Sequence, residues 1–278
     1  MSFRISENFI QGKSPIRQKC EDRIVITDNF VCVIDGATSK SSLQFDSKTQ
    51  GVISGELIEK VLTSFDPDGG VDQLIEEINI EFNKFYQDQR LAAHMKTAPV
   101  DRLNASMIVY SDHLKELWLI GDCQAMINGQ KITNPKIIDE VLSNLRAFVI
   151  DTQLMQGASI EDLITSDTAR ETIMPFLKEQ SLFQNNCFES IYSYVVLDGF
   201  EINPGHIKKY KVPDTGFLVL ATDGYPELFD NLHQSEHHLK HILENDPLCH
   251  RLFKSTKGLQ AGNLSFDDRA YVKIEITG

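Results

Sequence analysis

The chain lacks most of the features that mark secreted, membrane-spanning or nucleic-acid-binding proteins. It has only 27 lysines and arginines against 40 aspartates and glutamates, a formal net charge of −13 over 278 residues. That charge disfavours binding to a phosphate backbone or to an anionic membrane. No apolar run is long enough to cross a bilayer, and the N-terminus has no apolar core of signal-peptide length. We therefore expect a cytoplasmic protein with no nucleic-acid or membrane partner.

Cysteine is also scarce, and no two cysteines stand at the C-x-x-C spacing of a zinc ribbon. The odd number and wide spacing favour buried free thiols in a reducing compartment over disulfides. The five are Cys20, Cys32, Cys123, Cys187 and Cys249.

What the chain does have is an ordinary globular composition, 41% hydrophobic and 24% charged. Runs with strand periodicity alternate with pairs of helical runs, and hairpins replace β-α-β units, so we predict one α+β domain over residues 1–278. Strands are predicted as a hairpin at 24–27 and 30–35, an antiparallel meander at 104–110, 116–122 and 123–129, and later strands at 190–199, 215–224 and 270–276. Helices are predicted at 50–65, at 72–85 with Asp72 as its cap, and over most of 227–254. A helical insertion at roughly 136–186 is expected to lie over the sheet.

The hairpin turn is predicted at Asp28-Asn29, because both residue types tolerate positive φ. The strand that follows runs directly into Asp35-Gly36. Further acidic residues flank other predicted strands: Glu21, Asp22, Asp122, Asp223, Asp267 and Asp268.

If these strand ends share one rim, they form a carboxylate cluster with no built-in cation. Like charges so close raise each other's pKa or require a counter-ion. Hard divalent cations such as Mg²⁺ and Mn²⁺ prefer such oxygen ligands. Gly36 would let its carbonyl approach a metal, and Arg17, four residues before Glu21, is suited to bind a phosphate bidentately.

Taken in order, these motifs resemble the metal-dependent protein phosphatases of type 2C, the PPM family. The most specific pieces are "LVLATDGYPELFD", "VCVIDG" and "IGDCQA". The resemblance implies a four-layer αββα sandwich, two antiparallel sheets flanked by helices, with two Mg²⁺ or Mn²⁺ ions at one end. It implies hydrolysis of phosphomonoesters, by default phosphoserine and phosphothreonine in proteins, by a water activated by both metals.

The resemblance also implies roles for individual residues. Asp35 would bridge the metals, with Gly36 and Glu21 on one ion and Asp223 and Asp267 on the other. Asp122 would match the ligand of a third, more weakly held ion. Asp22 would orient metal-bound water, and Arg17 would grip the substrate phosphate.

Two positions depart from the family pattern. Ala37 stands where many members have a histidine proposed to protonate the leaving group, which implies a slower enzyme, a preference for good leaving groups, or no activity. The last motif reads Asp267-Asp268 in place of Asp-Asn, so either aspartate is a candidate ligand, with Asp267 preferred for its spacing to the strand. The identity of the substrate, a phosphoprotein or a small phosphoester, is left open, as are the oligomeric state and the role of the insertion.

Other interpretations compete with this one. Each Asp-Gly pair taken alone is more typical of a turn, and Asp198-Gly199 is assigned to one. A haloacid-dehalogenase-type phosphatase would need a second aspartate at Ala37. His233, His237 and His241 share a helical face that suits zinc, but a solvated polar face is favoured. The remaining alternative is a catalytically silent regulatory or binding module on the same fold.

Overall fold

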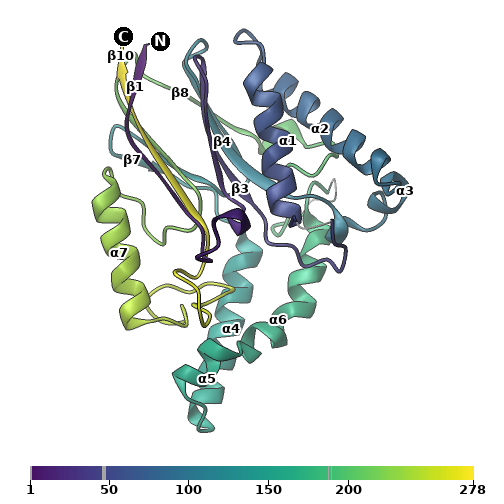
Figure 1. Ribbon diagram of the computed structural model, residues 1–278, viewed down its shortest axis with the longest axis vertical. Helices are drawn as coiled ribbons and strands as arrows, with labels where there is room; N and C mark the ends of the chain where they lie inside the picture. The colour runs from purple at the N-terminus through teal and green to yellow at the C-terminus, as the bar shows by residue number, and fades with distance from the viewer. Residues whose placement is uncertain (1, 46–47, 187, 189) are drawn as a thin grey trace.

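The computed structural model describes residues 2–45, 48–186, 188 and 190–278, so Cys187 lies outside the described residues. Two five-stranded antiparallel sheets pack face to face, and helices flank them (Figure 1). The α+β sandwich predicted from the sequence is confirmed. A membrane crossing needs a longer and more apolar helix than any in these ranges.

The first sheet has the strand order β1-β10-β9-β6-β7 and the second the order β2-β3-β4-β5-β8. The strands of the first sheet are β1 (Phe3–Gln11), β6 (Gln124–Ile127), β7 (Gln130–Ile132), β9 (Thr215–Ala221) and β10 (Arg269–Thr277). Those of the second are β2 (Arg23–Ile26), β3 (Phe30–Gly36), β4 (Ala105–Ser111), β5 (Glu116–Ile120) and β8 (Lys208–Lys211).

Strand β3 is apolar from Phe30 to Ile34 because both of its faces are buried there. Val31 and Val33 pack into the core between the two sheets. Phe30, Cys32 and Ile34 alternate with them and pack into the core under the helices. A strand covered on both faces reads as a continuous apolar run, which is the pattern of this segment.

The helices are α1 (Gln50–Ser64), α2 (Val71–Asp88), α3 (Ala92–Met95), α4 (Ile137–Met155), α5 (Ile160–Thr165), α6 (Thr168–Glu179) and α7 (Leu232–Asn245). In Figure 1, α1 and α2 flank the second sheet, and α7 flanks the first. Among the described residues, α7 is the one long helix that flanks the first sheet, whereas a pair of helices was expected there. A bidentate ion pair from Arg269 to Glu236, with N–O distances of 2.7 and 2.8 Å, ties α7 to the start of β10.

The predicted insertion is helical, but it does not lie over a sheet. Helices α4, α5 and α6 extend from one end of the sandwich, opposite the two chain termini (Figure 1). Helix α5 begins with a capping box, since Ser159 accepts a hydrogen bond from the Asp162 amide and the Asp162 carboxylate accepts one from the Ser159 amide. Both sheets contribute to one shared core, so we keep the prediction of a single domain.

Several predicted elements are wrong in detail. The meander breaks after β5, because the chain crosses at 121–123 to the other sheet, where β6 pairs with β9 and β7. Residues 190–199 form isolated bridges and bends, not a strand, and the strand in this region is β8. Helix α2 is capped by Gly70, with Asp72 in its first turn, and only 232–245 of the predicted 227–254 is helical. The β2–β3 hairpin forms, but neither turn residue has positive φ.

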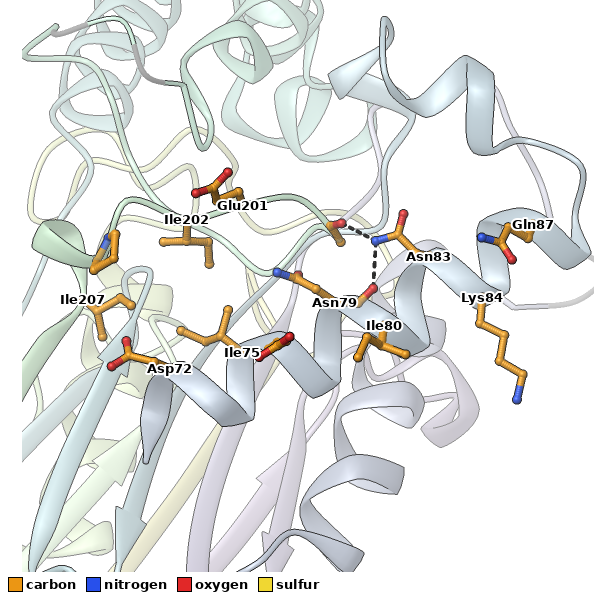
Figure 2. Close-up of a pocket in the computed structure, with 13 residues that line it drawn as sticks. Asp72, Ile75, Asn79, Ile80, Asn83, Lys84, Gln87, Glu201, Ile202 and Ile207 are labelled. Carbon is orange, nitrogen blue, oxygen red and sulfur yellow. Dashed lines mark hydrogen bonds between the residues drawn. The ribbon is translucent and has the colours of Figure 1, made fainter. Parts of the chain in front are cut away.

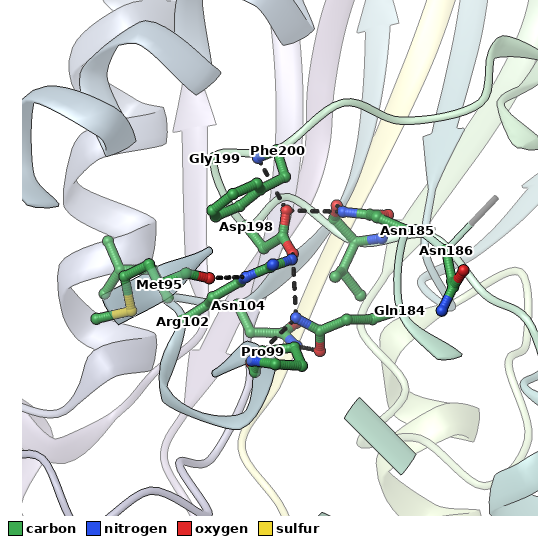
Figure 3. Close-up of polar contacts among 12 residues, drawn as sticks. Met95, Pro99, Arg102, Asn104, Gln184, Asn185, Asn186, Asp198, Gly199 and Phe200 are labelled. Atoms are coloured by element: carbon green, nitrogen blue, oxygen red, sulfur yellow. Dashed lines mark hydrogen bonds and ion pairs between the residues drawn. The ribbon is translucent and has the colours of Figure 1, made fainter. Parts of the chain in front are cut away.

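Asp198 does more than make a turn. Its fully buried carboxylate pairs with Arg102 Nη1 at 2.9 Å and accepts hydrogen bonds from Gln184 Nε2, Asn185 Nδ2 and the Phe200 amide at 2.8–3.0 Å (Figure 3). The network joins the end of the insertion to the segment before β4. Asp198 is therefore a structural centre of this region, because it contacts Arg102 from one segment and Gln184 and Asn185 from another.

Candidate active site

The strand registers bring the predicted acidic residues to one end of the sandwich. In the second sheet, Arg23 lies opposite Ile34, and Asp35 opposite Ser106. In the first sheet, Ala221 lies opposite Tyr271. The residues that precede β2 and β10 and those that follow β5 and β9 consequently meet at one rim. We call this set the carboxylate cluster: Glu21, Asp22, Asp35, Asp122, Asp223 and Asp267.

Close backbone packing at two glycines holds this rim together. A Cβ atom on Gly36 would lie 2.5 Å from the Glu21 carbonyl oxygen and 2.6 Å from that of Gly51 on α1. A Cβ on Gly224 would overlap the Asp268 carbonyl oxygen. Glycine is therefore required at both positions by chain packing. At Gly36, this packing requirement explains the glycine in addition to the metal contact that the sequence predicts.

Asp35 and Asp223 are the least compensated members of the cluster. No hydrogen bond or ion pair to either carboxylate is found among the described residues. Burial, followed by the charges of Asp22 and Asp122, raises the pKa of Asp35 well above its usual range. Burial, followed by the charges of Asp35 and Asp122, does the same to the pKa of Asp223. These two groups carry a local excess of negative charge that favours a bound cation.

The prediction that the cluster has no built-in cation is wrong. Lys13 Nζ lies 3.0 Å from Glu21 Oε2 and 3.6 Å from Asp267 Oδ1. Lys257 forms a second ion pair with Asp267, and Lys136 Nζ lies 2.8 Å from Asp122 Oδ2. The sequence carries no motif around these lysines, which reach the rim from loops or from the start of a helix.

These lysines divide the cluster into two kinds of carboxylate. Burial, the largest single cause, would raise the pKa of Asp122, but the charge and hydrogen bond of Lys136 and the hydrogen bond from Ser106 together outweigh it, and the net shift is downward. Lys257 and Lys13 likewise outweigh burial at Asp267 and lower its pKa. Asp122 and Asp267 are thus neutralised ion-pair members, while Asp35 and Asp223 are not.

The two adjacent aspartates before β10 have different surroundings. Asp268 Oδ1 accepts a hydrogen bond from the Lys13 amide at 2.7 Å, and Asp268 Oδ2 accepts one from the Glu21 amide at 3.2 Å. Asp267 instead lines the cavity described below. This placement supports Asp267 as the candidate ligand. Asp268 instead links the segment before β10 to the backbone of Lys13 and Glu21.

Glu21 and Asp22 precede β2 and are almost fully buried. Glu21 Oε1 and Asp22 Oδ2 have no hydrogen-bond partner among the described residues. Burial and the charge of Asp268 raise the pKa of Asp22 well above its usual range. Such orphaned oxygens are costly in a folded protein unless a ligand, ion or proton satisfies them.

Arg17 is not brought to the cluster. It lies in a short 3-10 helix (Arg17–Lys19), its side chain is exposed, and it does not line the cavity. The basic group beside Glu21 is Lys13, which precedes the predicted motif.

A cavity of about 470 Å³ opens beside the cluster, between the sheet rim and the insertion. Asp35, Gly36, Asp122, Asp223 and Asp267 form its acidic side. Its remaining charged lining consists of Lys40, Lys136, Asp139, Glu140, Arg170, Lys254 and Lys257. The volume is in the range typical of small-ligand sites.

A second cavity lies elsewhere, between α2 and residues 199–207 (Figure 2). It measures about 740 Å³ and is lined by side chains such as Ile75, Asn79 and Ile202. None of the predicted site residues lines it. The chemistry is therefore concentrated in the smaller cavity.

The donors of the cluster fit a hard divalent cation in kind, since they are carboxylate and carbonyl oxygens with orphaned members. Across the described part of the chain, however, no three His, Cys, Asp or Glu side chains converge into a ready metal-binding group. The exposed histidines of α7 form no such group either. Lys13 and Lys257 take up oxygens that a metal would otherwise use.

No protein-family model and no curated protein matches this sequence. Among solved structures, the chain matches the catalytic domain of the serine/threonine protein phosphatase PstP in complex with two manganese ions. The TM-score is 0.50 at 14% identity, covering 99% of each chain. Stp1 of Staphylococcus aureus matches at 15% identity and a TM-score of 0.49, covering 99% of this chain and 96% of that one. RsbX in complex with magnesium matches at 9% identity and a TM-score of 0.44, covering 99% of each. The match to PstP shows that this chain has the fold of serine/threonine phosphatase catalytic domains, the fold that its motif resemblance to type 2C phosphatases implies.

Proposed function

We propose that this protein is a Mg²⁺- or Mn²⁺-dependent phosphomonoester hydrolase that acts in the cytoplasm, by default on phosphoserine or phosphothreonine in proteins. The observation that carries the proposal is the pair Asp35 and Asp223, two uncompensated carboxylates with raised pKa on one wall of the cavity. They occupy this position in a phosphatase fold whose PstP example binds two manganese ions.

Asp35, Asp223 and Asp267, with the Gly36 carbonyl and Glu21, would hold two ions, and Asp122 would hold a third, weaker one. When bound, the ions lower the pKa of a coordinated water so that it acts as a nucleophile near neutral pH. Asp22, whose charge acts on Asp35, has an orphaned oxygen and a raised pKa, which suits it to accept or hold a proton.

The leaving group receives no protonated side chain from position 37, which is alanine. Good leaving groups need little acid catalysis, so we expect the enzyme to favour aryl phosphates over alkyl phosphates more strongly than a histidine-bearing relative does.

The experiment that tests the proposal is hydrolysis of p-nitrophenyl phosphate with Mn²⁺, with Mg²⁺ and with EDTA. We expect turnover only with metal, and a loss of at least about 100-fold in Asp223→Ala, because a ligand of the metal is removed. Arg17→Ala is the matched control for a charge change outside the cavity and should alter kcat/KM by less than about threefold. Metal-independent turnover, or full activity in Asp223→Ala, would contradict the proposal.

One observation favours the alternative, a catalytically silent binding module: Lys13 and Lys257 already neutralise part of the cluster. If the folded protein hydrolyses no phosphoester with either metal, it is a binding module of this kind and not a hydrolase.

The lysines also give a prediction about metal affinity. Lys13→Gln removes a cation that competes for Glu21 and Asp267, so Mn²⁺ should bind about tenfold more tightly, a change of roughly 1.4 kcal/mol. Isothermal titration of the EDTA-stripped protein measures this. Lys254→Gln, at a cavity lysine that donates its hydrogen bond to Asn144, is the control that should leave the affinity unchanged. Weaker binding in Lys13→Gln would mean that Lys13 organises the ligands and does not compete for them.

A further inference from the structure

Basic side chains line the cavity together with the acidic residues of the carboxylate cluster. Besides Lys254, which donates a hydrogen bond to Asn144, four of them line it, and each comes from a different part of the chain. They are Lys40 from the loop after β3, Lys136 before α4, Arg170 on α6, and Lys257 from the loop before β10. The convergence of four cations on one concave surface raises the local potential for an anion.

Only two of these cations are committed to the cluster. Lys136 pairs with Asp122 and Lys257 with Asp267, so their charge is largely matched. No ion pair or hydrogen bond of the Lys40 ammonium is found within the described ranges. The Arg170 guanidinium likewise has no ion pair among these residues, and its one hydrogen bond there runs from Nη1 to the Thr256 carbonyl oxygen at 2.5 Å. Lys40 and Arg170 therefore present donors to the cavity that no protein carboxylate takes up.

The surroundings of Lys40 show that it lacks a counter-ion. Burial lowers its pKa to about 8, and the charges of Lys136, Arg170 and Lys257 act in the same direction against the single carboxylate of Asp139. Asp139 is itself engaged, since its Oδ1 accepts a hydrogen bond from Gln180 Nε2 at 2.9 Å. A lysine that is desolvated among like charges is stabilised when an anion binds.

We propose that Lys40 and Arg170 form an anion subsite that binds a second phosphate or carboxylate group of the ligand whose phosphoester faces the carboxylate cluster. The identity of the ligand as a substrate rests on the proposed function, whereas the subsite itself does not. The distribution of charge supports two separate positions, because Asp35 and Asp223 have no cation partner and Lys40 and Arg170 have no carboxylate partner among the described residues of the cavity lining. The cavity, at about 470 Å³, has room for more than one phosphoryl group. The preferred substrate is accordingly a phosphoester with an additional anionic group, such as a phosphorylated residue beside an acidic one.

The subsite is tested first by titration of inorganic phosphate into the whole protein in EDTA, where no metal contributes to binding. We expect Lys40→Gln and Arg170→Gln each to weaken phosphate binding by about tenfold or more, because each removes a charge-assisted contact. Lys254→Gln, which changes a lysine of the same cavity that already has a partner, should change it by less than about twofold. Thermal unfolding of each variant shows that the fold is retained. Equal binding in all four proteins, or no binding in the wild type, would overturn the proposal.

The second test compares kcat and KM for matched pairs of substrates. One pair is a phosphothreonine peptide with a neutral or an aspartate neighbour, and the other is a small alkyl monophosphate with or without a second phosphate. We expect the KM to be about tenfold lower for the doubly anionic member of one pair, and this difference to be lost in Lys40→Gln without a change in kcat. That result supports the subsite, and the pair that shows it tells whether the second anionic group comes from a peptide or from a small molecule. Equal KM values in both pairs would overturn the substrate preference. If no ester is hydrolysed, the proposed function fails, and phosphate binding in EDTA still decides the subsite.

Discussion

Asp35→Asn should abolish hydrolysis and at the same time stabilise the metal-free protein. The substitution removes a metal-binding oxygen at the centre of the proposed site, so p-nitrophenyl phosphate turnover should fall by about 1000-fold or more. It also removes a charge that lies among Asp22, Asp122 and Asp267 with no partner of its own. Functional sites commonly hold such strained electrostatics at the expense of stability. We expect the melting temperature in EDTA to rise by about 2–4 °C.

The pH dependence of this stabilisation has a definite sign. The pKa of Asp35 is raised in the folded state, whereas in the unfolded chain it has its ordinary value near about 4. Between those values the native state binds more protons than the unfolded state, so the free energy of unfolding falls as pH rises. The advantage of Asp35→Asn over wild type in EDTA should therefore grow from acidic to neutral pH, and saturating Mn²⁺ should reverse it.

The control is Asp112→Asn, at a carboxylate with several partners far from the cluster. Its pKa is lowered to about 2, with burial opposed by hydrogen bonds from Lys115 and Ser2. Neutralising it should destabilise the protein at neutral pH and leave turnover intact. A destabilised Asp35→Asn protein in EDTA would show that the cluster is compensated without metal, and would count against a cation site there.

Asp198→Ala should be the most destabilising single substitution of a polar residue in this chain. Removing the carboxylate leaves the partly buried Arg102 without its counter-ion and deprives Gln184, Asn185 and the Phe200 amide of an acceptor. Breaking a buried ion pair on one side typically costs about 3–5 kcal/mol. Urea or thermal unfolding, followed by circular dichroism, measures the loss.

The matched control is Asp198→Asn, which keeps the shape and part of the hydrogen bonding but not the charge. We expect it to cost less than the alanine variant. An alanine variant as stable as wild type would mean that water replaces the carboxylate, so the network in Figure 3 would not hold the insertion to the sandwich.

The sequence allowed the framework of the site to be predicted because its acidic residues are tied to strand ends. Asp35 and Asp223 each follow a buried apolar run, and this local pattern can be recognised even when the strand order is predicted wrongly. The crossing of the chain between sheets at 121–123 was not predictable from periodicity, because β5 and β6 read as consecutive strands joined by a tight turn. Sheet membership depends on partners distant in sequence.

The basic half of the cavity was also beyond prediction. Lysine side chains are long, and their exposed positions in loops carry no periodic signal, so nothing in the sequence distinguishes Lys13 or Lys40 from surface lysines. The spacing of the motif predicts Arg17 as the basic group of the site, whereas the folded chain places Lys13 beside Glu21. The strand 208–211 was missed for a similar reason, since its side chains are mostly exposed lysines without alternation.

The antiparallel pairing of β1 with β10, from Phe3↔Ile276 to Gln11↔Arg269 with a register shift between Ile5 and Glu7, has a consequence for the order in which the protein is made. During synthesis, Glu21 and Asp35 emerge from the ribosome well before Asp267 and before β10, the strand that completes the first sheet. The N-terminal strand must wait for a partner that follows it by more than 250 residues, a contact of very high sequence separation. The nascent chain therefore has no complete cavity, and whatever this site binds, it first does so only after the last strand has left the exit tunnel and closed the sheet.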